Sequence, residues 1–180
     1  DKNEILKAIE NGKIHYPFVQ KLRQGGYDGR GVEVINNEKE LQKLMEGPSV
    51  IEEKVEIDKE LAIIVARNGK GDIRCFPAVE MVFDPIANLV DQLLCPSNIN
   101  NNTNTEAKLI SSKLVEKMNF KGLLAVEFFL DKKGSLLVNE VAPRPHNSGH
   151  HTIESVITSQ YEQHLRAILN LPLGSTHLKM

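Results

Sequence analysis

The sequence predicts an α+β fold, and two features of its pattern carry that prediction. Short segments of high β propensity recur along the chain and outnumber the segments with helical periodicity. Two pairs of these segments are joined by short glycine-containing connections, at 23–31 and 132–135, which predicts antiparallel hairpins. Because strands and helices do not simply alternate, a doubly wound parallel sheet is disfavoured.

Composition bounds the class of protein. The 180 residues are 41% hydrophobic and 26% charged, which fits a compact globular chain with a sizeable core. A net charge of −2 gives no basic excess for binding nucleic acid or an anionic membrane, and no apolar run approaches the roughly 20 residues of a membrane span. Cys75 and Cys95 have no metal or redox spacing and suit a reducing, cytoplasmic compartment. Because the sequence opens at Asp1 without an initiator Met, we expect a piece of a longer polypeptide.

The elements follow from apolar periodicity and from glycine, proline and asparagine punctuation. Gly12 can end a first helix, Asn36 or Asn37 can cap a second, and Gly47 with Pro48 can close it. In order, we expect a helix at 3–10, strands at 16–23 and 31–35, a helix at 38–47, strands at 49–57, 59–67, 73–83 and 87–95, a helix at 105–118, a strand–turn–strand unit at 122–144, a loop at 145–152 and a helix at 153–170.

The segment "RQGGYDGRGVEV" (23–34) places four glycines within seven residues. It joins strand to strand and lacks a following Gly-Lys-Ser/Thr, so it is neither a P-loop nor a dinucleotide fingerprint. Its unhindered N–H groups, with Lys21, Arg23 and Arg30 beside them, can fold over a polyphosphate. The alternative is an exposed, mobile hairpin tip.

Two acidic residues lie in apolar runs, Glu127 in "LLAVEFFL" and Glu140 in "LLVNEVAP". A turn at Lys133–Gly134, or over 132–135, pairs residues whose numbers sum to 267, which sets Glu127 opposite Glu140. Like charges there are destabilising, and desolvation of both carboxylates would make the repulsion worse. A divalent cation such as Mg²⁺ between them would offset it. The alternatives are a solvated pair, one protonated acid, or a three-residue turn that shifts the register by one.

The segment after the second acid offers groups for an anion. If the strand stays regular, alternation places Arg144 on the face of Glu140, where its guanidinium can orient a planar carboxylate or carbonate, or pair with the acids themselves. His146, His150 and His151 lack the assured geometry of a zinc site, and a polar loop donating to an anionic substrate fits them better.

The charged run "IEEKVEIDKE" (51–60) connects two predicted strands. It is either a solvated hinge or a segment that offers backbone groups to a flat heterocycle, with Glu60 on a ribose. Periodicity does not separate these interpretations.

The motifs "GGYDGRGV" and "NEVAPRPHNSGH", with the spacing between them, resemble the 5-(carboxyamino)imidazole ribonucleotide synthase family of ATP-grasp ligases. The resemblance covers nearly the whole chain. It implies an ATP-grasp fold in which a small lobe (1–57) with the glycine-rich loop and a larger lobe (58–180) with the metal site grip ATP between antiparallel sheets. The family has a further domain before and after this region, so we expect most of the ATP and metal site here but only part of the substrate site.

The resemblance also implies roles for matching residues, with Mg²⁺ on Glu127 and Glu140. The implied ATP contacts are Lys21, Gly26, Tyr27, Asp28, Gly29, Arg30, Gly31, Val32, Glu52, Glu53, Lys54, Val55, Glu60, Asn139 and Glu140. The implied substrate contacts are Tyr27, Asp28, Arg30, Arg144, His146 and Asn147, of which Asp28, Arg30 and Arg144 are the catalytic candidates. Strict alternation would point Asn139 away from Glu140, and Ala142 stands where many ATP-grasp enzymes have Asn.

The implied activity is ATP-dependent carboxylation of aminoimidazole ribonucleotide with bicarbonate, through carboxyphosphate, by a cytoplasmic enzyme that is a homodimer at full length and has no nucleic-acid or membrane partner. Two alternatives stay open. One is another ATP-grasp carboxylate–amine ligase or a formate-dependent transformylase. The other is a nucleotide-binding segment that turns over poorly on its own.

Overall fold

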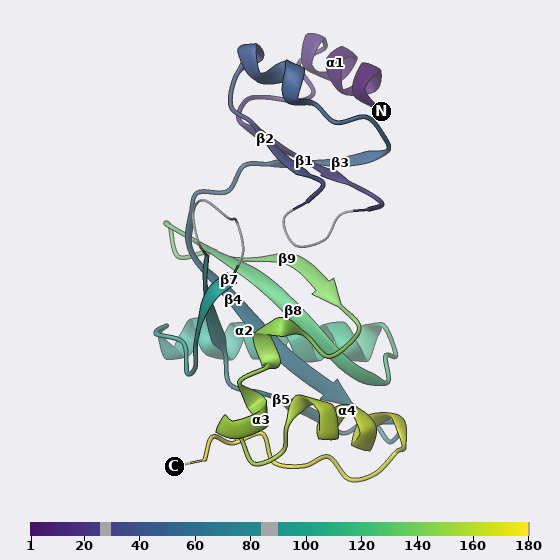
Figure 1. Cartoon of the computed structure of the whole chain (residues 1–180), viewed down its shortest axis with the longest axis vertical. Coiled ribbons are helices and arrows are strands. Elements are labelled where there is room, and N and C mark those ends of the chain that lie inside the picture. Colours follow the sequence, from purple (N-terminus) through teal and green to yellow (C-terminus); the bar gives the residue numbers. More distant parts are fainter. Residues whose placement is uncertain (26–29, 84–89, 180) are drawn as a thin grey trace. The chain divides into compact units, whose positions relative to one another are not determined.

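The computed structural model describes residues 1–25, 30–83 and 90–179 (Figure 1). Among these residues the chain forms two compact units, the first comprising Asp1–Glu56 and the second beginning at Ile57. Each unit pairs an antiparallel sheet with helices, which confirms the predicted α+β class.

The first unit is a three-stranded sheet covered on one face by short helices. Its strands run in the order β2–β1–β3, and the buried core on the covered face is formed by Ile5, Phe18, Ile35 and Leu44. The elements are α1 (Lys2–Glu10), β1 (Phe18–Leu22), β2 (Val32–Ile35), the 3₁₀ helix η1 (Glu38–Lys43) and β3 (Ser49–Glu53).

In this unit the first hairpin forms as predicted and the second helix does not. The first hairpin is confirmed, because β1 and β2 pair antiparallel with Lys21 opposite Val32. The helix predicted at 38–47 is wrong in type and length, since only the six-residue η1 forms. The predicted start is confirmed, since Asn37 caps the helix and accepts from the Lys39 N–H, while Glu40 accepts from the backbone and side chain of Asn36.

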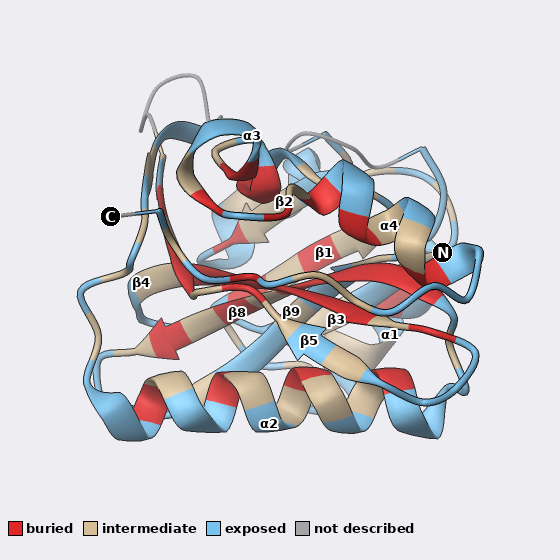
Figure 2. Ribbon diagram, turned by 90° about the horizontal axis from the view of Figure 1, so that it is seen from below, coloured by how far each residue is buried: buried red, intermediate tan, exposed pale blue. Residues whose placement is uncertain are grey.

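The second unit is a sheet in the order β7–β6–β4–β8–β9, with β5 paired to β4. Its strands are β4 (Ile57–Arg67), β5 (Ile73–Cys75), β6 (Val79–Phe83), β7 (Val90–Leu94), β8 (Gly122–Asp131) and β9 (Leu136–Ala142). Its helices are α2 (Asn101–Lys117), η2 (Asn147–Gly149), α3 (Thr152–Ser155) and α4 (Gln160–Ile168). Figure 2 shows α2 on one side of the sheet and α3 and α4 on the other.

The two faces of this sheet are covered to different extents. On the α2 face, Phe128 and neighbouring side chains of β4 and β8 form a buried cluster. On β8 this cluster extends as far as Leu130. On the other face the buried cluster includes Leu123 and Ala125 of β8 but no residue beyond Ala125 on that strand. Because alternate residues share a face, the next position there is Glu127. The hydrophobic cluster on this face of β8 therefore ends beside an acidic residue.

Three predicted boundaries in this unit are wrong. The strand predicted at 73–83 is split into β5 and β6, because Pro77 has no N–H to donate. The helix predicted at 153–170 is split into α3 and α4, because Val156 instead forms a β-bridge with Leu178. Helix α2 begins four residues before the predicted start, since the Asn100 side chain caps it.

The β8–β9 hairpin turns through three residues, so the predicted two- or four-residue turn is wrong. The Asp131 N–H donates to the Ser135 carbonyl, and the Asp131 carboxylate accepts from the Lys133 and Ser135 N–H groups. Gly134 closes the turn with a φ of 86°. The pairs nearest the turn consequently sum to 266, as in Leu130 with Leu136.

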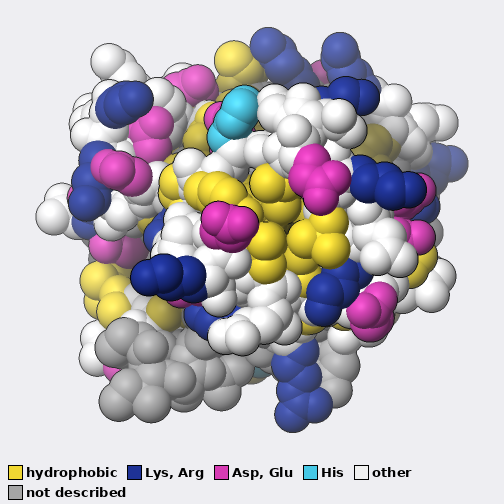
Figure 3. All heavy atoms as spheres, turned by 90° about the horizontal axis from the view of Figure 1, so that it is seen from above, with side chains coloured by type: hydrophobic (Ala, Val, Ile, Leu, Met, Phe, Trp, Pro, Cys, Tyr) yellow, Lys and Arg dark blue, Asp and Glu magenta, His cyan; other side chains and the backbone are white. Residues whose placement is uncertain are grey.

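No helix in the described ranges is long and apolar enough to cross a membrane. The face shown in Figure 3 carries lysine and arginine side chains interspersed with acidic ones, in keeping with a net charge of −2.

We expect Gly134→Ala to lower the free energy of unfolding by about 1 kcal/mol, because an L side chain at positive φ is strained. A Cβ at this position would meet nothing within 4 Å, so backbone conformation alone sets the cost. Gly134→Asn is the matched control, since Asn tolerates this region. Urea denaturation measures both variants, and equal stability of the Ala variant and the wild type would contradict the turn geometry.

Candidate functional site

A β-bulge determines which side chains meet on the face of the sheet opposite α2. Phe128 pairs with Val138, whereas Glu127 pairs with Glu140, so Asn139 is an extra residue on β9. The bulge restores the register that the three-residue turn had shifted, and the predicted pairing of the two acids is confirmed. Glu127 and Glu140 therefore lie directly opposite each other on the same face of the sheet.

The same bulge changes the interpretation of Asn139. Val138 lies opposite Phe128, whose side chain belongs to the α2 face. Alternation from Val138 assigns Asn139 to the other face, and the bulge then keeps Glu140 on that face as well. Asn139 and Glu140 therefore lie on the same face, although strict alternation would have separated them.

The Glu127 carboxyl has an unusual proton affinity. Its pKa is raised from 4.5 to about 7, chiefly by burial and also by the charges of Glu140 and Glu60, while Arg144 acts in the opposite direction. Glu60 lies on β4 opposite Phe129, hence on the same face as Glu127, and burial raises the pKa of Glu60 as well. The expectation that both paired acids are desolvated is wrong, because Glu140 is exposed.

His146 reaches the buried acid from the loop after β9. Its Nε2 lies 3.4 Å from the Glu127 Oε1, and its side chain is only 11% exposed. The Ser148 N–H donates to Nδ1, which leaves the proton of a neutral imidazole on Nε2, facing the carboxylate. The structure thus brings His146 together with the acid pair.

Arg144 is positioned by a bend and not by strand alternation. Strand β9 ends at Ala142, and the Arg144 N–H donates back to the Ala142 carbonyl, so the expected regular strand is wrong here. The exposed guanidinium donates to the Pro145 carbonyl and still lowers the pKa of Glu127. Asn147, in η2, is exposed and its carbonyl accepts from the His150 N–H.

The acid pair fits a hard divalent cation that brings further ligands with it. Among residues 1–25, 30–83 and 90–179 there is no group of three or more His, Cys, Asp or Glu side chains that could hold a metal ion by itself. Mg²⁺ is typically held by one or two carboxylates and completed by phosphate oxygens and water. The opposed carboxylates of Glu127 and Glu140 offer that donor set as two protein ligands.

The first unit carries the remaining predicted residues that the structure describes. The Lys21 Nζ lies 2.7 Å from the Glu52 Oε2, and the Lys54 Nζ donates to the Asn36 side chain. Glu53 ends β3 in an exposed position, and Val55 lies between β3 and β4. Among the glycine-loop residues, Arg30 is exposed, Gly31 has a φ of 74° and Val32 begins β2. Gly26, Tyr27, Asp28 and Gly29 lie outside the described residues.

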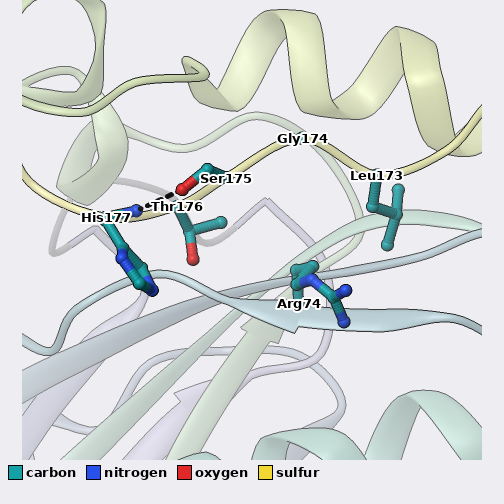
Figure 4. Close-up of a pocket in the computed structure, with 6 residues that line it drawn as sticks. All are labelled: Arg74, Leu173, Gly174, Ser175, Thr176 and His177. Carbon is teal, nitrogen blue, oxygen red and sulfur yellow. Dashed lines mark hydrogen bonds between the residues drawn. The ribbon is translucent and has the colours of Figure 1, made fainter.

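Sequence reasoning missed Gln160, whose buried side chain bonds both backbone groups of His146. Its signal was available, because Gln160, Gln163 and Ala167 recur at helical spacing on the buried face of α4. A cavity of about 280 Å³ lies between β5 and the C-terminal segment (Figure 4). None of the residues that line it is a predicted site residue, so it is separate from the acid pair.

A family model described as "ATP-grasp domain" matches residues 1–161, and the chain therefore belongs to the ATP-grasp family.

Within that family the chain is similar to the N5-carboxyaminoimidazole ribonucleotide synthase of Bacillus subtilis, with 41% identity over 98% of this chain and 47% of the relative. The crystal structure of the synthetase from Thermotoga maritima matches with a TM-score of 0.84 and 46% identity, over 99% of this chain and 44% of that one. The Aspergillus clavatus synthase, solved with ADP and 5-aminoimidazole ribonucleotide, matches with a TM-score of 0.84 and 31% identity, over 98% and 46%. The chain spans about half the length of the curated relatives it matches.

The raised pKa of Glu127 predicts a pH-dependent stability. With a pKa of about 7 in the folded chain and 4.5 ordinarily, Glu127 binds more protons in the folded state between those values. The stability that it contributes is complete below the lower value and is lost as the pH rises through the upper one. We expect Glu127→Gln to be more stable than the wild type by on the order of 2–3 kcal/mol near pH 8 and equal to it near pH 4.

Urea denaturation of both proteins at the two pH values measures this difference. A difference between Glu127→Gln and wild type that is the same at both pH values would contradict the raised pKa.

Proposed function

We propose that this chain carries the ATP- and metal-binding part of a carboxylase. The enzyme would use ATP and bicarbonate to convert 5-aminoimidazole ribonucleotide to its 5-carboxyamino form, through carboxyphosphate, releasing ADP and phosphate. One structural observation supports this most directly: Glu127, partly buried and raised in pKa to about 7, lies opposite Glu140. The printed names of the similar synthases supply the substrate class.

The acid pair is proposed as the magnesium site. Bound Mg²⁺ supplies positive charge that neutralises phosphate oxygens during phosphoryl transfer. Glu127 and Glu140 would bind it, and the Nε2–H of His146 would hold Glu127 in place. Asn139 lies on the same face through the bulge and would add an amide contact to the nucleotide.

Arg144, His146 and Asn147 are proposed to bind the carbonate and the acceptor. A guanidinium presents parallel N–H donors to a planar anion, and Arg144 is exposed at the bend after β9. Tyr27, Asp28 and Arg30 are proposed to contact the ribonucleotide.

The nucleotide is proposed to use residues of both units. The first unit would act as the small lobe of the ATP-grasp fold (1–57) and the second as the large lobe (58–180). Lys21 and the segment Glu52–Val55 would contact ATP from the small lobe, and Glu60 would contact the ribose. The glycine-rich loop would close over the phosphates, and the full-length enzyme is proposed to be a homodimer.

We expect Glu140→Ala to weaken binding of MgATP about tenfold, because one of two carboxylate ligands is lost. Calorimetric titration of the protein with MgATP measures the change. Glu116→Ala is the matched control, since Glu116 is an exposed acid on α2, across the sheet from the pair. Equal affinities of wild type and Glu140→Ala would count against the metal assignment.

We expect slow phosphate release from MgATP that rises above its background only when bicarbonate and aminoimidazole ribonucleotide are both present. Formate or an amino acid in place of bicarbonate should leave the background unchanged, because Arg144 and His146 are proposed to bind carbonate. A coupled phosphate assay measures the rates. Stimulation by formate or by an amino acid would instead assign the chain to a different ATP-grasp ligase.

A further inference from the structure

Gln160 makes a two-point contact with the backbone of the loop that carries His146. It is the first residue of α4 and its side chain is 0% exposed. The Gln160 Oε1 accepts from the His146 N–H at 2.9 Å, and the Gln160 Nε2 donates to the His146 carbonyl at 2.8 Å. The carboxamide therefore pairs with the N–H and the carbonyl of one residue, as a neighbouring β-strand would.

The position of Gln160 is itself fixed from two sides. Its backbone N–H, which α4 cannot satisfy internally, donates to the Thr152 Oγ1 at 2.9 Å. The same hydroxyl donates to the Gly149 carbonyl at 2.6 Å. A Cβ added at Gly149 would come within 2.5 Å of the Gln160 Oε1, so glycine is required for the amide to occupy its place. Gln160, Thr152 and Gly149 thus interlock η2 with the start of α4.

The residue held in this way is the one that contacts the buried acid. The His146 Nδ1 lies 3.0 Å from the Ser148 Oγ, and the Nε2 lies 3.4 Å from the Glu127 Oε1. Ser148 orients the ring, but the place of the ring relative to β8 depends on where the backbone of His146 sits. That backbone has its N–H and its carbonyl bonded to Gln160.

We propose that Gln160 is a positioning residue of the acid site, whose carboxamide fixes the backbone of His146 and thereby holds the imidazole against Glu127. Both hydrogen bonds of its carboxamide go to the backbone of His146, so its effect on the acids passes through that residue. The consequence for nucleotide binding rests on the function proposed above, whereas the positioning of His146 does not.

Gln163 provides a matched control one turn along the same helix. It is also 0% exposed, and it makes the same two-point contact with a different backbone residue. The Gln163 Nε2 donates to the Gly174 carbonyl at 3.0 Å, and the Gly174 N–H donates to the Gln163 Oε1 at 2.8 Å. Gly174 lies in the C-terminal segment that lines the cavity of Figure 4. Loss of either amide thus removes two partly buried hydrogen bonds, but only the Gln160 amide contacts His146.

The test compares Gln160→Met with Gln163→Met in the whole chain. Nitrogen-15 NMR of the imidazoles reports the environment of His146, whose signals are assigned with a His146→Asn variant. Urea denaturation measures stability, and calorimetry measures the affinity for MgATP. We expect a similar fall in urea midpoint for both variants. Only Gln160→Met should shift the His146 resonances and weaken MgATP binding, by about tenfold.

A double-mutant cycle sharpens the result. Glu127→Gln should move the Nε2 resonance of His146 in the wild-type background and leave it unmoved in Gln160→Met, where the contact is already lost. Should Gln160→Met not fold, Gly149→Ala displaces the same amide without deleting it and should shift the same resonances.

Two results would overturn the proposal. One is that the His146 resonances of Gln160→Met are the same as those of the wild type. If that variant does not fold, the same result in Gly149→Ala counts instead. The other is an equal shift in Gln163→Met. If the wild type itself does not bind MgATP, the proposed function fails, while the His146 resonances still decide the role of Gln160.

Discussion

The feature on which the site depends is the meeting of two carboxylates across the β8–β9 ladder. Opposed like charges destabilise a sheet, and here burial of Glu127 adds to the repulsion from Glu140 and Glu60. The chain offsets this in part with its own groups, the imidazole of His146 and the guanidinium of Arg144. The negative charge that these groups leave uncompensated favours binding of a cation that arrives with its own anionic ligand.

The environment of Glu127 follows from how differently the two faces of the second-unit sheet are packed. Helix α2 runs along one face, whereas the segments after β9 bury only part of the other, with a cluster that includes Ala125 of β8. Glu127 therefore sits at the edge of a hydrophobic core, where it is shielded enough to raise its pKa yet still borders an open surface. The loop that returns across this edge brings His146, and α4 anchors that loop through Gln160.

The sequence was sufficient for features that follow from short-range pattern and insufficient for those that depend on tertiary contacts. Hairpin alternation predicted the α+β class and the pairing of Glu127 with Glu140. The route to that pairing was wrong, because the three-residue turn and the bulge at Asn139 each shift the register by one and cancel. The bend that redirects Arg144 does have a local signal, since Pro143 and Pro145 flank it and neither has an N–H to continue the ladder. The buried contact of Gln160 depends on a loop 14 residues away.

A carbon-13 NMR titration of the Glu127 carboxyl, with and without Mg²⁺ and a non-hydrolysable ATP analogue, tests the central claim most directly. The account predicts a midpoint of about 7 in the free protein. It predicts a fall of more than about one unit when the cation and nucleotide are added, because a bound cation favours the ionised form. A free-protein midpoint at the ordinary value, or one that the additions leave in place, would contradict it.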